Sequence, residues 1–267
     1  MVSSPVILIT GASSGIGEAT ARLFGKQGFR VVLAARRLDR LQSIAEEIRV
    51  DGQQALPVEA DLSCFDNVQR LVGCALDEFG QVDVLFNNAG FGRIDWLETL
   101  DPQKDIQKQL EVNLLAAIWM SRALLPHMIA RHSGHIINMS SMAGWVAAPT
   151  YTVYAASKFG MRGFTDALRR EVGVFGIHVS ALYPGGVTTE FGEKAGIKRK
   201  TGYTTPKWLR LTPENVAQAV FDLTRKPRRV VILPWPMRFM IWLDNLAPGF
   251  LDRLIEKNFV KPERGLS

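Results

Sequence analysis

The chain has 267 residues, 47% of them hydrophobic and 22% charged, and this composition suits one α/β domain with a large core. Its two cysteines, Cys64 and Cys74, exclude a disulfide framework and a cysteine metal cluster, and no run reaches the ~18 uninterrupted apolar residues of a membrane span. The net charge of +6 is uneven, because residues 194–267 contain 15 Lys and Arg against 6 Asp and Glu.

Short apolar runs alternate with longer helical patterns along the chain. Continuously apolar runs such as 31–35 are typical of parallel strands covered on both faces. The alternation predicts right-handed βαβ units in a doubly wound α/β sheet, formed by a single domain over residues 1–267. The predicted strands are 6–10, 30–35, 55–59, 82–86, 135–140, 177–183 and 229–233, and the predicted helices are 15–27, 38–50, 65–79, 103–131, 151–173 and 213–225.

The first strand begins at Val6, which leaves no room for a charged region and a cleavage site before it. We therefore expect a cytoplasmic protein without a secretory signal. This strand runs into a turn rich in glycine, from Thr10 to Gly17, that opens a helix. Glycines permit a tight turn and close approach of the backbone to a pyrophosphate, whose charge a helix N-terminus stabilises. The spacing is not G-x-G-x-x-G, but its place after the first strand predicts nucleotide binding.

The second strand ends at Ala35 and is followed by Arg36 and Arg37. An NAD site of this type places a carboxylate here for the ribose 2′-hydroxyl. Ala35 supplies none, and Asp39 lies further along, in the next predicted helix. An arginine at this position can pair with a 2′-phosphate through two parallel hydrogen bonds. The sequence therefore predicts NADP(H) over NAD(H).

Tyr154 and Lys158 lie four residues apart in a predicted helix, so their side chains share one face. An unperturbed tyrosine has a pKa of about 10, too high for proton transfer near neutral pH. A neighbouring cation stabilises the phenolate and lowers that pKa. The pair is therefore a candidate general acid/base. How strongly it indicates catalysis depends on the other motifs in the chain.

An ordered series of motifs over residues 5 to about 235 resembles the short-chain dehydrogenase/reductase family in its single-domain branch. The resemblance implies a Rossmann-type, mainly parallel seven-stranded sheet of order 3-2-1-4-5-6-7 with helices on both faces. The motifs are Thr10-Gly11-x-x-x-Gly15-Ile16-Gly17, Asp61-Leu62, Asn87-Asn88-Ala89-Gly90, Asn113, Ser140-Ser141, Tyr154-x-x-x-Lys158 and Pro184-Gly185-Gly186-Val187-Thr188-Thr189.

The resemblance also implies the site residues, and it implies a site without a metal ion. The family's catalytic serine precedes its tyrosine by thirteen residues, which selects Ser141 over Ser140. The implied catalytic tetrad is Asn113, Ser141, Tyr154 and Lys158. The implied cofactor contacts are Gly11, Ser13, Ser14, Gly15, Ile16, Gly17, Arg36, Arg37, Asp61, Leu62, Asn88, Ala89, Gly90, Tyr154, Lys158, Pro184, Gly185, Val187 and Thr189.

Two segments differ from regular βαβ connections. Residues 187–212 form a long loop with Phe191, Tyr203 and the basic run 198–200, and we interpret it as a substrate lid. Trp145, Val146 and Tyr151 are candidate pocket walls. Residues 235–267 form an apolar, basic C-terminal extension. Its simpler interpretation is packing against the domain or a sister subunit, and the alternative is peripheral membrane contact.

The leading hypothesis is an NADP(H)-dependent oxidoreductase that acts on a lipophilic carbonyl/alcohol substrate. The apolar extension favours a lipophilic substrate, and the basic lid favours the alternative of a 3-oxoacyl-carrier reductase. A non-catalytic NADP-binding regulatory protein is a further alternative, against which the complete tetrad argues. A sugar-nucleotide epimerase and a nucleic-acid-binding module fit poorly, since neither a larger substrate domain nor a recognition motif is present. The resemblance also implies a homo-oligomer.

Overall fold

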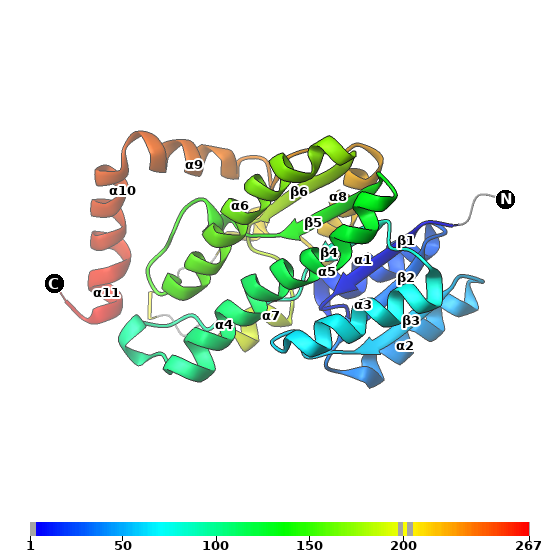
Figure 1. Ribbon diagram of the computed structural model, residues 1–267. Helices are drawn as coiled ribbons and strands as arrows, with labels where there is room; N and C mark the ends of the chain where they lie inside the picture. The colour runs from blue at the N-terminus through cyan, green and yellow to red at the C-terminus, as the bar shows by residue number, and fades with distance from the viewer. Residues whose placement is uncertain (1–3, 197–199, 202–204, 267) are drawn as a thin grey trace.

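The computed structural model, which describes residues 4–196, 200–201 and 205–266, is built around one twisted sheet (Figure 1). Seven strands, all pairing in parallel, have the order β3-β2-β1-β4-β5-β6-β7. The predicted strand order is therefore confirmed. The strands are β1 (Val6–Thr10), β2 (Arg30–Ala35), β3 (Ala55–Glu59), β4 (Val84–Asn87), β5 (Gly134–Met139), β6 (Ile177–Pro184) and β7 (Val230–Leu233).

Helices join consecutive strands and cover both faces of the sheet (Figure 1). Each predicted helix is present with ends within two residues of its predicted bounds, while α7 and α9 to α11 were not predicted. The α-helices are α1 (Gly15–Lys26), α2 (Leu38–Val50), α3 (Phe65–Phe79), α4 (Lys108–Leu110), α5 (Ala116–Ala130), α6 (Thr152–Val172), α7 (Glu190–Lys194), α8 (Pro213–Arg225), α9 (Met237–Leu246), α10 (Pro248–Ile255) and α11 (Lys261–Arg264).

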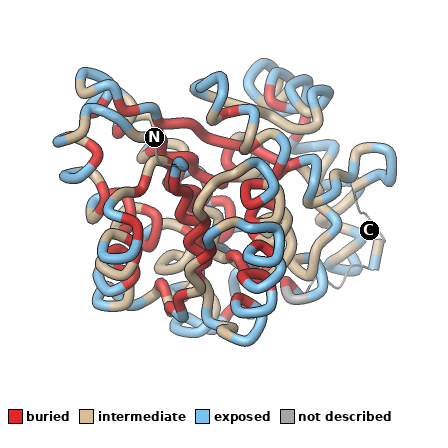
Figure 2. The backbone as a smooth tube through the Cα atoms, turned by 90° about the vertical axis from the view of Figure 1, so that its right-hand side faces the viewer, coloured by how far each residue is buried: buried red, intermediate tan, exposed pale blue. Residues whose placement is uncertain are grey.

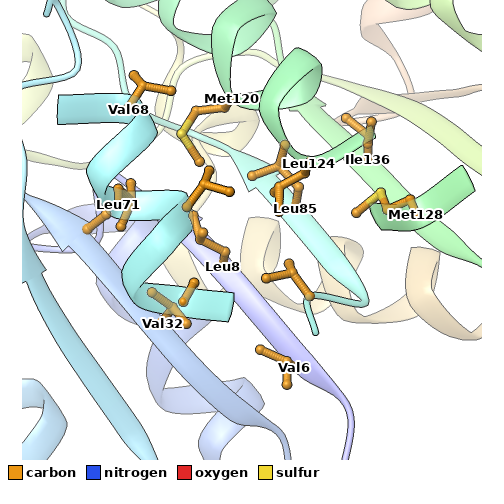
Figure 3. Close-up of a cluster of buried hydrophobic side chains, with 14 of the residues drawn as sticks. Val6, Leu8, Val32, Val68, Leu71, Leu85, Met120, Leu124, Met128 and Ile136 are labelled. Carbon is orange, nitrogen blue, oxygen red and sulfur yellow. The ribbon is translucent and has the colours of Figure 1, made fainter. Parts of the chain in front are cut away.

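The core consists of two apolar layers, one on each face of the sheet, which appear as the buried interior in Figure 2. Alternate residues of β1 enter opposite layers: Val6 and Leu8 face α3, α5 and α6, whereas Ile7 and Ile9 face α1, α2 and α8. Figure 3 shows the first layer, where Leu8 and Leu85 of the strands meet helix residues such as Leu124. Burial on both faces is what makes these strands continuously apolar in sequence.

The predicted helix 103–131 is one helical run, Pro102–Ala130, interrupted by two π-helical turns. The turns cover Pro102–Gln107 and Glu111–Leu115. By length and composition this run could cross a membrane. Its residues Met120, Leu124 and Met128 instead pack fully buried against the sheet, so it is a core helix of this domain.

A chain of buried amides and hydroxyls joins β4, β5 and α6. The Asn87 Nδ2 atom donates to Asn138 Oδ1 at 2.8 Å, and Asn138 Nδ2 donates to Thr165 Oγ1 at 2.9 Å. Thr165 Oγ1 in turn donates a hydrogen bond to the Met161 carbonyl at 2.6 Å. Buried polar groups are stabilising only while they are paired, so this chain fixes α6 in register with the two central strands.

The segment 187–212, predicted to be a lid, is joined at its two ends. Val187 forms a parallel bridge with Leu211, and the Thr188 amide donates to the Leu211 carbonyl at 3.0 Å. The short helix α7 lies between these ends. Of the residues that suggested a basic, aromatic lid, Lys198, Arg199 and Tyr203 lie outside the described residues.

Replacement of Asn138 by alanine should lower the free energy of unfolding by about 2 kcal/mol, because it removes two buried hydrogen bonds, one with Asn87 and one with Thr165. Urea denaturation of Asn138→Ala measures this loss. The double variant Asn87→Ala/Asn138→Ala should lose less than the sum of the two single losses. Strictly additive losses would contradict a coupled buried chain.

Candidate active site

The predicted site residues gather at the carboxyl edge of the sheet. They occupy the segments that follow β1, β2, β3, β4, β5 and β6, together with the π turn before α5 and the first two turns of α6. Open parallel sheets place their ligands at this edge. The fold therefore brings together residues that are far apart in sequence.

The turn between β1 and α1 is shaped by its glycines. Gly11 and Gly15 adopt φ angles of +67° and +56°, a region that strains other residues. A Cβ atom on Gly17 would lie 2.2 Å from the Gly11 carbonyl oxygen, so only glycine allows these two backbone segments to approach so closely. The N-cap residue Ser14 makes no side-chain capping bond, so the amides of the first turn of α1 are not capped by it. A helix start of this kind fits a pyrophosphate.

Thr10 is the first residue of the glycine motif, but it was not among the implied site residues. Its hydroxyl oxygen accepts hydrogen bonds from the Asn88 and Ala89 amides at 2.9 and 3.0 Å. The Asn88 side chain returns a bond to the Thr10 carbonyl at 2.9 Å. The position of Thr10 at the end of the first strand was the available signal. These bonds hold the segment after β4 beside the glycine turn.

The two arginines after β2 have different surroundings. Arg36 is exposed and lies close enough to Asp61 to influence its carboxylate. Burial raises the pKa of Asp61, but hydrogen bonds from Ser63 and the charges of Lys108 and Arg36 lower it overall. Arg37 bonds Ser13 Oγ at 3.3 Å and pairs with Glu190 of α7 at 3.4 Å.

The second π turn fixes Asn113, which is almost fully buried. Its Oδ1 atom accepts from the Phe91 amide at 2.9 Å, and its Nδ2 atom donates to the Phe91 carbonyl at 2.8 Å. Nδ2 also lies 3.3 Å from Ser157 Oγ. π turns occur frequently at functional sites. The side chain thus ties the long helix, the segment after β4 and α6 together behind the tetrad.

Ser141, Tyr154 and Lys158 lie together between the end of β5 and α6. The Ser141 hydroxyl lies close enough to the Tyr154 phenol to favour its phenolate form. Ser141 Oγ accepts a hydrogen bond from the Ala143 amide at 3.1 Å. Lys158 Nζ lies 5.6 Å from the Tyr154 ring centroid and donates to the Met139 carbonyl at 2.9 Å. Ser140 Oγ donates to the Lys158 carbonyl at 3.2 Å, which gives it a supporting position in the fold.

The predicted lowering of the Tyr154 pKa is wrong for this arrangement. Tyr154 is 8% exposed, and burial raises its pKa to about 12, with a smaller opposing effect from the Ser141 hydroxyl. Lys158 is 3% exposed, and burial lowers its pKa to about 8. The physical reason is that the ammonium is directed at the Met139 carbonyl, so desolvation outweighs any charge effect on the phenol.

Aromatic side chains border the tyrosine. The Phe191 ring of α7 lies 5.6 Å from the Tyr154 ring, and the Tyr151 ring lies 6.1 Å from it. Trp145 packs against Tyr183 at 5.5 Å and lies under the Arg162 guanidinium. Phe191 and Tyr151 therefore form walls beside Tyr154. Trp145, also predicted as a pocket wall, packs on Tyr183 and Arg162 instead.

Comparison with known proteins finds relatives over most of the chain. A family model described as short chain dehydrogenase matches residues 5–200. The chain is similar to the dehydrogenase/reductase SDR family protein 7-like of Drosophila melanogaster, with 34% identity over 270 residues that cover 97% of this chain and 81% of the relative.

Solved structures share the architecture. An alcohol dehydrogenase from Thermococcus sibiricus, complexed with 5-hydroxy-NADP, is 30% identical with a TM-score of 0.77, covering 86% of this chain and 96% of its own. A short chain dehydrogenase/reductase from Burkholderia phymatum, in complex with NAD, is 25% identical with a TM-score of 0.83, covering 94% and 97%. The sheet order, the glycine turn and these matches show that the chain belongs to the short-chain dehydrogenase/reductase family of oxidoreductases.

Proposed function

We propose that this oxidoreductase uses NADP(H) to transfer a hydride to or from the carbonyl/alcohol group of a lipophilic substrate. The observation that carries the proposal is the gathering of two hydroxyls, Ser141 and Tyr154, with Lys158 and Asn113 at the carboxyl edge of the sheet. When bound, the nicotinamide supplies and accepts the hydride, and the protein supplies orientation and proton handling.

The residues present fit a dinucleotide. Because Gly11 and Gly17 have no side chains, the backbone is accessible at the start of α1, where the pyrophosphate would bind. Arg36 and Arg37 flank the end of β2, one toward Asp61 and the other toward Ser13. Two guanidinium groups at this place, with Ala35 in the usual carboxylate position, support a 2′-phosphate.

Proton handling follows from the two hydroxyls. In the reductive direction Tyr154 would protonate the developing alkoxide, which is basic enough to take a proton even from a phenol whose pKa is raised to about 12. Ser141 would donate a hydrogen bond to the substrate oxygen as negative charge develops on it. Lys158 would hold the nicotinamide ribose, and Asn113 positions the π turn and α6 around it.

The substrate side is apolar near the reacting hydroxyl. Phe191 and Tyr151 flank Tyr154 and would accept a lipophilic carbonyl compound. A 3-oxoacyl-carrier reductase is the second candidate, favoured by the basic residues of segment 187–212, among them the described Lys207 and Arg210. Turnover of a panel of lipophilic ketones, aldehydes and 3-oxoacyl thioesters, followed by NADPH absorbance, distinguishes the two.

Replacement of Tyr154 by phenylalanine should leave NADPH binding intact and lower turnover by about 10²- to 10⁴-fold, because the proton donor is lost. Fluorescence titration measures NADPH binding, and steady-state kinetics measures turnover. Tyr183→Phe is the matched control, since it removes a phenol whose ring packs on Trp145 and not on Tyr154. Wild-type turnover by the Tyr154 variant would refute the assignment.

Replacement of Arg36 by aspartate should lower the ratio of kcat/KM for NADPH over NADH by about 10- to 100-fold, because a charged hydrogen bond is replaced by repulsion. Arg40→Asp, an exposed change on α2, controls for net charge. An unchanged ratio in the Arg36 variant, or equal use of both cofactors by the wild type, would contradict NADP(H) selection at this position.

Replacement of Lys158 by methionine should abolish turnover yet raise the free energy of unfolding at pH 7 by roughly 1–3 kcal/mol, because a desolvated ammonium is removed. The native pKa of about 8 lies below the ordinary lysine pKa of 10.5, so between these pH values the unfolded wild type binds more protons than the native one. Wild-type stability therefore rises with pH across this window, and its deficit against the variant narrows. Urea denaturation of both proteins from pH 7 to 10.5 measures the gap, and a constant gap would contradict the burial of a charged lysine.

A further inference from the structure

The C-terminal arm, residues 235–266, carries most of the large apolar side chains that the described part of the chain exposes. The arm leaves the end of β7 as α9 and continues through α10 to α11 at the side of the molecule (orange to red, Figure 1). Monomeric soluble proteins rarely expose such a concentration of apolar surface without a partner. The exposed apolar residues of the arm are Trp235, Phe239, Met240, Trp242, Leu246, Phe250, Leu254 and Leu266.

The exposed side of α9 is its apolar side. Phe239, Trp242 and Leu246 have the spacing i, i+3, i+7 and so form one stripe, while the buried Ile241 points the opposite way. Phe239 and Trp242 are 61% and 57% exposed, and their rings stack with centroids 5.7 Å apart. An ordinary surface helix has the reverse orientation, with its apolar stripe toward the core.

A row of cations follows on the next helix. Arg253, Lys257 and Lys261 are spaced i, i+4, i+8 along the run from Pro248 to Arg264. With Glu256, Pro262 and Leu266 they line a groove of about 420 Å³. Lys261 approaches Glu256 at 3.9 Å, whereas Arg253 and Lys257 have no hydrogen-bond or ion-pair partner among the described residues.

Both ends of the arm are fastened to the domain, so its apolar stripe is held outward. Near its start Met237 packs beside Gly185, and Ile241 is buried. At its far end Arg264 stacks on Trp96 and forms an ion pair with Glu98.

We propose that this arm docks on the surface of an anionic lipid membrane. Trp, Phe and Leu side chains on an interfacial helix bury into the boundary between headgroups and acyl chains, and neighbouring Lys and Arg bind the anionic headgroups. The cation row selects this occupant over a second copy, because Arg253 and Lys257 form no ion pair within the described residues and a layer of anionic headgroups supplies the missing countercharge. The proposal does not depend on the oxidoreductase substrate.

Co-sedimentation of the full-length protein with two kinds of vesicle tests the docking. We expect binding to vesicles of phosphatidylcholine with phosphatidylglycerol, weakening as salt rises, and much weaker binding to phosphatidylcholine alone. Phe239→Glu/Trp242→Glu should reduce binding at least about tenfold, and Arg253→Ala/Lys257→Ala/Lys261→Ala should reduce it by about fivefold for each cation removed.

Matched variants elsewhere on the surface control for general effects. Val174→Glu changes an exposed apolar residue before β6, at the amino-terminal ends of the strands, whereas the arm starts from the carboxyl end of β7. Lys26→Ala/Arg122→Ala/Arg170→Ala removes three exposed cations from α1, α5 and α6. These controls should bind vesicles like the wild type, and circular dichroism checks that every variant is folded. Failure of the wild type to bind anionic vesicles would overturn the proposal, as would equal binding by the arm variants. A dimer that the Phe239→Glu/Trp242→Glu change converts to a monomer, with no vesicle binding, would assign the face to a second copy instead.

Discussion

The hydrogen bond from Lys158 Nζ to the Met139 carbonyl is the constraint around which the site is built. It places a nearly fully buried ammonium at the end of β5, where desolvation is costly and a single carbonyl is a weak replacement for water. The surrounding bonds make that arrangement rigid: Ser140 bonds the Lys158 carbonyl, and Asn113 reaches Ser157 on the same helix. A charge held in this way at the expense of stability is typical of functional sites, where electrostatic strain is part of the chemistry.

Much of this site could be predicted from the sequence because its determinants are local. A glycine that must adopt positive φ, such as Gly11, is visible as a residue type, and a strand buried on both faces is visible as an apolar run. Since parallel strands align their carboxyl ends, predicted strands also placed Ser141 and Asn88 at one edge. The sheet order followed from a family resemblance that rested on such local motifs.

The features that were missed depend on tertiary contacts. The π turn that aims Asn113 adds one residue to a helical turn, which leaves the apolar pattern of the long helix nearly unchanged. The sign of the Tyr154 pKa shift was wrong because helical spacing places Lys158 beside the ring but cannot show that its ammonium points at Met139. Helix α9 was not predicted because apolar residues occupy all but one position from Met237 to Leu243, which hides the helical period.

The cofactor side and the substrate side of the site meet at Arg37. Its guanidinium bonds Ser13 in the nucleotide turn and Glu190 at the start of α7, the helix that carries Phe191. A Cβ atom on Gly15 would also lie 3.1 Å from the Thr189 side chain, so the turn and the N-cap of α7 are in close contact. Since Phe191 lies against the Tyr154 ring, Arg37 connects the nucleotide turn to the helix beside that ring. Arg37 is therefore placed between the turn proposed to bind the pyrophosphate and the helix that borders Tyr154.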